Sequence, residues 1–225
     1  MFYSVSRVSE GWPKTAKKAD RPVYSPRVTS TSPATPPTPS ATDAECLALT
    51  RNLRRRGTLV LSVFALVWAV AAASGTGSAT DVAPLGIEVA ALVLTAAAIY
   101  LGYRKDARPS PRTVSLPANW ARGVGIVNSV ELVAIFAVIA VSNASGHPEA
   151  VPAGIALVVG LHFFPLARLY DQWQYRWTAA LLTAVAVAGF VLVAAGLASE
   201  TVRIVVGLGS AVVLWASSYH LAVRG

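Results

Sequence analysis

Residues 178–198 read T-A-A-L-L-T-A-V-A-V-A-G-F-V-L-V-A-A-G-L-A and contain no charged side chain. An α-helix rises about 1.5 Å per residue, so a stretch of this length reaches about 30 Å, the thickness of the hydrocarbon core of a bilayer. A transmembrane β-strand needs only about 10 residues and alternates in polarity, which this stretch does not. The segment therefore predicts a transmembrane helix.

Similar apolar runs recur along the chain, which is 54% hydrophobic and 13% charged. Soluble domains carry about a quarter charged residues, so the composition also favours a membrane protein. We predict an all-α integral membrane bundle of six transmembrane helices. Their expected positions are Gly57–Ser74, Pro84–Tyr103, Gly123–Val141, Val151–Leu169, Thr178–Ala198 and Ile204–Val223.

The basic residues predict the orientation of this bundle. If the N-terminus is cytoplasmic, all 19 lysines and arginines except Arg203 fall on the cytoplasmic side, while Asp81, Glu149 and Glu200 fall outside. Basic residues concentrate in cytoplasmic loops, so we expect both termini in the cytoplasm and the protein in the plasma membrane. The first forty residues contain no apolar core of a cleavable signal peptide, so the first helix is expected to direct insertion.

The region before the first apolar run divides into two parts. Residues 1–42 hold seven of the 14 prolines among Ser, Thr, Lys and Arg, a composition that predicts disorder. Residues 43–56 predict a short juxtamembrane amphipathic helix capped by Asp43, and residues 57–225 form the transmembrane domain. The short helix ends in arginines that we expect to contact anionic lipid head groups, at about 1 kcal/mol each. These arginines are Arg51, Arg54, Arg55 and Arg56.

Several classes of function find no support. The net charge of +8 comes from residues that flank apolar runs, so no nucleic-acid partner is expected. Cys46 is the single cysteine, which excludes an internal disulfide and a cysteine-based metal site. Phosphate-binding, zinc-protease and serine-hydrolase motifs are absent. His162 and His220 would differ by about 8 Å in depth, so they do not suit a haem, and no cofactor is predicted.

Polar residues inside the predicted third and fourth helices are the candidates for function. Asn128 and Glu131 are three residues apart, so we expect them to share a helix face. Glu131 would lie about 12 Å, and His162 about 14 Å, from the inner surface on consecutive antiparallel helices. We therefore expect a Glu131–His162 contact. Ionisable groups inside a membrane are functional candidates, although a purely structural interhelical hydrogen bond explains the same pattern.

Pro165 follows shortly after His162 in the predicted fourth helix. Proline removes a backbone donor and clashes with the carbonyl of Leu161, so we expect a distorted helix beside His162. A distortion next to a polar residue favours a ligand pocket, and a simple packing kink is the alternative. Arg168 and Asp171 follow at the inner rim.

Residues 160–170 read G-L-H-F-F-P-L-A-R-L-Y. This segment resembles one found in small, uncharacterised bacterial polytopic membrane proteins. The resemblance covers the predicted third and fourth helices. It implies a bacterial inner membrane location and no assigned activity.

Three interpretations of function follow. The first is a small proton or solute transporter or channel that uses Asn128, Glu131 and His162. The second is a non-catalytic scaffold or envelope sensor that acts through the basic tail. The third is an intramembrane enzyme acting on lipids, for which no recognisable spacing exists. Protein partners and oligomeric state stay open, and the helices are expected to pack through small residues. These are Gly154, Gly160, Gly189, Gly196, Gly207 and Gly209.

Overall fold

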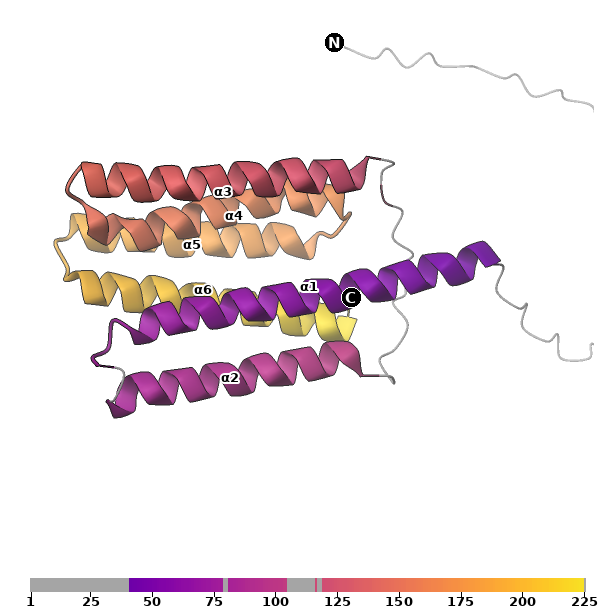
Figure 1. The fold of residues 1–225 in the computed structure, drawn as a ribbon, viewed down its shortest axis with the longest axis horizontal. Coiled ribbons are helices and arrows are strands. Elements are labelled where there is room, and N and C mark those ends of the chain that lie inside the picture. The colour runs from indigo at the N-terminus through magenta and orange to yellow at the C-terminus, as the bar shows by residue number, and fades with distance from the viewer. Residues whose placement is uncertain (1–40, 79–80, 105–115, 117–118, 225) are drawn as a thin grey trace, which may run out of the picture. The chain divides into compact units, whose positions relative to one another are not determined.

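The computed structural model describes residues 41–78, 81–104, 116 and 119–224. This part of the chain is helical, and the helices alternate in direction (Figure 1). The tail, residues 1–40, and the basic segment 105–115 lie outside the described residues, so the prediction of disorder in the tail stays a prediction. The elements are α1 (Ala41–Ala73), α2 (Val82–Tyr103), α3 (Trp120–Ala144), the short η1 (Pro148–Ala150), α4 (Val151–Leu169), α5 (Gln174–Ala194) and α6 (Ser199–Arg224).

Six of these helices are long and apolar enough to cross a membrane. Each contains an 18-residue window of mean hydropathy between 1.5 and 2.4. The chain is therefore a multi-pass membrane protein, as the six apolar runs of the sequence predict.

The first helix differs from its predicted form. The short juxtamembrane helix and the first transmembrane helix are one continuous element, α1, of 33 residues. It begins at Ala41, so Asp43 is its third residue and does not precede it. The junction contains no Pro, and the single Gly57 costs a helix only about 1 kcal/mol, so nothing interrupts the backbone between the two predicted segments.

The arginines of α1 do not share one environment. Arg51 and Arg56 are exposed, and the guanidinium of Arg55 lies 5.5 Å from the ring centroid of Tyr103 on α2. Arg54 is only 6% exposed. Arg54 is therefore the least accessible of the four arginines, and their contact with lipid head groups stays a prediction.

Two later helices begin earlier than predicted. α5 begins at Gln174, four residues before the predicted Thr178, and α6 begins at Ser199, five residues before Ile204. Hydropathy marks only the apolar part of a helix, whereas the backbone continues helically through its polar first turn. α5 ends at Ala194 because Gly196, with φ +72°, turns the chain, a conformation that glycine adopts without steric cost.

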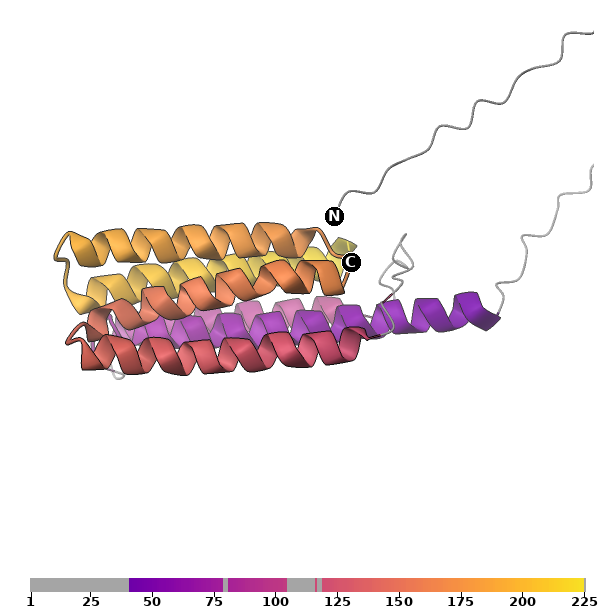
Figure 2. The same ribbon diagram turned by 90° about the horizontal axis from the view of Figure 1, so that it is seen from above.

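The helix α6 lies at the centre of the packing. It contacts α1, α2, α4 and α5, while α1 and α2 pack on one side and α4 and α5 on the other (Figures 1 and 2). Among the described helices, α3 packs only on α4 and η1, and it has no buried residue. The element that carries Asn128 and Glu131 is therefore attached to the bundle along one narrow strip.

Small residues allow the close helix approaches. A Cβ on Gly207 would lie 2.8 Å from Cβ of Ala72 on α1, and one on Gly189 would lie 2.9 Å from Cβ of Ala153 on α4. Gly154, Gly160 and Gly209 also face neighbouring helices at short range. Gly196 was also predicted to pack against a neighbouring helix, but no atom lies within 4 Å of its Cβ position. Its positive φ instead forms the turn after α5.

Both ends of the bundle have a distinct charge. α1 begins, α2 ends, α3 begins, α4 ends, α5 begins and α6 ends at one end, which we call the basic end (Figure 1). The described arginines outside α1 at this end are Arg104, Arg122, Arg168, Arg176 and Arg224. Asp81, Glu149, Glu200 and Arg203 lie toward the opposite end, which agrees with the charge asymmetry of the sequence.

Candidate functional site

Glu131 and His162 meet where α3 packs on α4. Nδ1 of His162 lies 3.2 Å from Oε1 of Glu131, and the side chains are 12% and 16% exposed, respectively. Each is well inside its helix, with Glu131 eleven residues after Trp120 and His162 seven residues before Leu169. The contact expected from counting residues along antiparallel helices is present.

The geometry of this contact is that of a close approach without a well-formed hydrogen bond. Both ring nitrogens of His162 are buried and lack a hydrogen-bond partner of acceptable geometry, although Glu131 is within 3.5 Å. The backbone of Val159, one turn earlier, also lies near the ring. The ring nitrogen and the carboxylate are therefore within reach of each other without forming a well-aligned hydrogen bond, and a small rotation of either side chain would change the interaction.

A series of aromatic contacts runs from His162 to the basic end. The ring of His162 lies 5.1 Å from that of Phe163, and Phe163 lies 5.7 Å from Tyr175 on α5. Tyr175 contacts Tyr170 at 6.1 Å, and Tyr170 contacts Trp120 of α3 at 5.7 Å. These ring pairs, each worth about 0.5–1.5 kcal/mol, hold the His162 end of α4 against α5.

Asn128 does not join this pair. It is exposed, whereas Val127, Glu131 and Ala134 are partly covered on the strip that faces α4. Three residues correspond to about 300° around a helix, so Asn128 lies about 60° from Glu131. Because α3 has no second helical neighbour, that rotation is enough to remove Asn128 from the interface.

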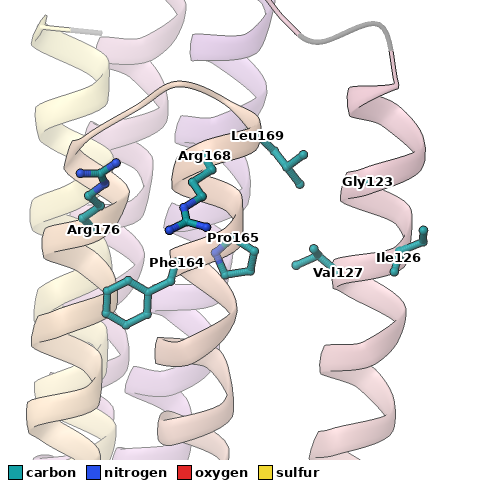
Figure 3. Close-up of a pocket in the computed structure, with 8 residues that line it drawn as sticks. All are labelled: Gly123, Ile126, Val127, Phe164, Pro165, Arg168, Leu169 and Arg176. Atoms are coloured by element: carbon teal, nitrogen blue, oxygen red, sulfur yellow. The ribbon is translucent and has the colours of Figure 1, made fainter. Parts of the chain in front are cut away.

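Pro165 lies inside α4, as predicted, and the helix continues past it to Leu169. It lines a groove of ≈ 780 Å³ between α3, α4 and the start of α5. The groove is lined by Gly123, Ile126, Val127, Phe164, Pro165, Arg168, Leu169 and Arg176 (Figure 3). A groove is therefore present beside Pro165, but His162 does not line it. It extends toward the basic end, and Val127, one helical turn before Glu131, lines it.

Arg168 and Asp171, the two residues predicted at the inner rim, lie in different surroundings. Arg168, in the last turn of α4, lines the groove. Asp171 is exposed in the turn to α5 with φ 49°, and it forms no ion pair with Arg168 in the described part of the chain. The turn closes with Tyr170 N–H donating to Leu166 O at 2.9 Å and Gln172 N–H donating to Ala167 O at 3.0 Å.

A second polar cluster, which the sequence reasoning missed, joins α1, α2 and α6. Ser62 Oγ lies 2.7 Å from Ser218 Oγ, and Trp215 Nε1 donates to Thr95 Oγ1 at 3.1 Å. Thr95 donates in turn to the carbonyl of Ser62 at 3.3 Å. All of these groups are uncharged and paired with one another, which is typical of interhelical hydrogen bonds that fix packing. In the sequence, the only indication of this cluster is one Ser or Thr on each helix. Such small residues do not stand out among the many alanines around them.

No group of His, Cys, Asp and Glu among the described residues could hold a metal ion. The comparisons with known proteins give one match: the sequence profile of a family of unknown function (DUF7010) matches residues 123–221. The match covers nearly all of α3 to α6, including the segment 160–170, and it agrees with a resemblance to uncharacterised proteins. No curated protein and no solved structure matches the chain.

Proposed function

We propose that the protein moves protons, or a small solute coupled to protons, through the membrane and that Glu131 and His162 form the site. The observation that carries this proposal is the 3.2 Å approach of two ionisable side chains within membrane-spanning helices. Such groups are costly in a bilayer. A neighbouring opposite charge favours the charged pair, whereas burial favours the neutral forms. Opposing effects therefore favour the charged and the neutral states of the pair, and we propose that the pair exchanges between them during transport.

The details of the contact favour transport over a structural bond. A bond retained for packing alone is expected to have good angles, whereas the ring nitrogens of His162 lack a well-formed partner. Both side chains keep some exposure, 12% and 16%, although the two ring nitrogens of His162 are themselves buried. The groove lined by Val127 and Pro165 ends one helical turn from Glu131, on the side of the basic end, and neither Glu131 nor His162 lines it.

The proposal includes the placement of the protein. We infer a bacterial plasma membrane protein with the basic end, and both termini, in the cytoplasm. Arg51, Arg55 and Arg56 of α1 are then near anionic head groups. The groove opens toward the cytoplasm, and the acidic loops at Asp81 and Glu149 face outward.

The test uses purified protein in proteoliposomes containing a pH-sensitive dye, with a pH gradient imposed across the membrane. Glu131→Gln and His162→Asn should each slow proton entry by about 100-fold or more, the lower end of what a positioned proton-transfer group contributes. The matched control is the second Glu–His contact of the chain, in which Nδ1 of His147 lies 3.0 Å from Oε1 of Glu149 in an exposed loop.

Glu149→Gln and His147→Asn should leave the flux unchanged. If the Glu131 and His162 variants fold and transport like the wild type, the pair is structural. The scaffold interpretation, in which the protein moves nothing, predicts instead that wild-type proteoliposomes admit protons no faster than protein-free liposomes. If the loop variants reduce flux as strongly, the effect does not come from the intramembrane site.

A further inference from the structure

The groove between α3 and α4 brings two guanidinium groups together. Arg168 comes from the last turn of α4 and Arg176 from the first turn of α5, and both line the same space (Figure 3). The four-residue turn between the helices sets this proximity. Both side chains are exposed, so an incoming ligand can reach them.

Neither guanidinium has a partner within the described ranges. The ion pairs there involve His147 with Glu149 and His162 with Glu131, and no other interaction is noted for either arginine. Asp171, in the turn between them, pairs with neither. Two like charges that face one space repel each other unless an anion lies between them, and the arginine fork matches phosphate oxygens in a bidentate geometry.

The other walls of the groove are apolar. Ile126 and Val127 of α3 and Phe164, Pro165 and Leu169 of α4 line it, and Figure 3 shows Leu169 pointing toward Gly123 on α3. A Cβ on Gly123 would lie 2.8 Å from Cδ2 of Leu169, so glycine leaves room for the Leu169 side chain against α3. An inorganic anion would use only the arginines, whereas a lipid would use both the arginines and the hydrocarbon walls.

Aromatic residues place this groove at head-group level. Trp120 and Tyr170 lie 5.7 Å apart beside it, and Trp173 and Trp177, both exposed, lie 6.2 Å apart in and just after the turn. Trp and Tyr concentrate where the hydrocarbon core meets the head groups. Basic pockets between transmembrane helices at that level bind anionic head groups.

We propose that this groove is a binding site for one anionic phospholipid. Arg168 and Arg176 hold its phosphate, and an acyl chain lies along Val127, Phe164 and Leu169. The proposal is independent of proton transport, because it uses neither Glu131 nor His162.

The test is native mass spectrometry of the detergent-solubilised full-length protein with phosphatidylglycerol or phosphatidylcholine added. The wild type should retain one phosphatidylglycerol in preference to phosphatidylcholine. Arg168→Gln with Arg176→Gln should weaken retention by roughly tenfold or more, since each arginine contact to a phosphate is charge-assisted. The matched control is Arg104→Gln with Arg224→Gln, which removes the same charge at the basic end without touching the groove.

The control pair should bind like the wild type, and so should Glu131→Gln, which separates lipid binding from transport. Glycerol phosphate in the same experiment should not displace the lipid, because it cannot use the apolar walls. Equal losses in both double variants, or an unchanged Arg168 and Arg176 variant with intact fold, would overturn the proposal. Displacement by glycerol phosphate would overturn the lipid as occupant.

Discussion

Asp171 occupies a backbone conformation that favours glycine. Its φ of 49° lies in the left-handed region, at the point where α4 ends and the chain turns into α5. This region costs most non-glycine residues about 1–2 kcal/mol, and Asp and Asn tolerate it better than other residues do. Asp171→Val should therefore lower the free energy of unfolding by about 1 kcal/mol. Asp171→Gly and Asp171→Asn should not lower it. Thermal unfolding of purified variants in detergent measures the difference, and a Val variant as stable as the Gly variant would contradict the assignment.

The depth of a residue in the membrane, counted along its helix, predicted one contact of the candidate site correctly, whereas residue spacing failed for Asn128. Glu131 and His162 were predicted to meet because consecutive antiparallel helices place residues of equal depth side by side, which needs only the rise per residue. Asn128 was assigned to the same face from its three-residue spacing, and it is exposed. A helix with several neighbours buries residues over a wide part of its surface, whereas a helix with one neighbour buries only a narrow strip. The sequence does not indicate that α3 has one helical neighbour.

Helix contacts provide a prediction about packing between α1 and α6. A Cβ at position 207 would lie 2.8 Å from Cβ of Ala72 and 2.9 Å from the backbone carbonyl of Trp68. A carbonyl cannot move without shifting α1, so Gly207→Ala should destabilise the fold by about 1–3 kcal/mol. Gly86 on α2 has no atom within 4 Å of its Cβ position. Gly86→Ala is thus a matched control, expected to be neutral or stabilising by up to about 1 kcal/mol through helix propensity. Unfolding in increasing SDS compares the two, and equal effects would contradict the close approach.

The helices themselves were the most predictable elements, because an apolar run long enough to cross a bilayer has few alternatives. Their ends were less predictable. α1 continues through Arg54 and Gly57 as one helix, and α6 begins at Ser199 in a polar turn. Hydropathy does not detect polar helical turns. The hydroxyl cluster of Ser62, Thr95 and Ser218 also required the structure, since it depends on which helices are neighbours.

In the whole molecule, the order of the helices along the chain differs from their arrangement in space. The last helix, α6, is the central one and joins the pair α1 and α2 to the pair α4 and α5. The family match begins at residue 123 and ends at residue 221, so it includes the candidate pair, the groove and the central helix. It excludes the hairpin of α1 and α2, which packs on α6 from the other side. The features on which both proposals rest therefore lie within the matched residues, and α1 and α2 lie outside them.

Orientation is the property of the whole molecule on which the cytoplasmic groove depends, and the single cysteine allows a direct test. Cys46 precedes the candidate span Ala48–Ala73 at the basic end. Ser145 is exposed in the turn after α3 at the opposite end. A membrane-impermeant maleimide should label Cys46 only after cells are permeabilised. In a Cys46→Ser background, Ser145→Cys should be labelled in intact cells, and Cys46→Ser alone gives the unlabelled control. Because the helices alternate, the reverse pattern at Ser145→Cys would place both termini and the groove outside.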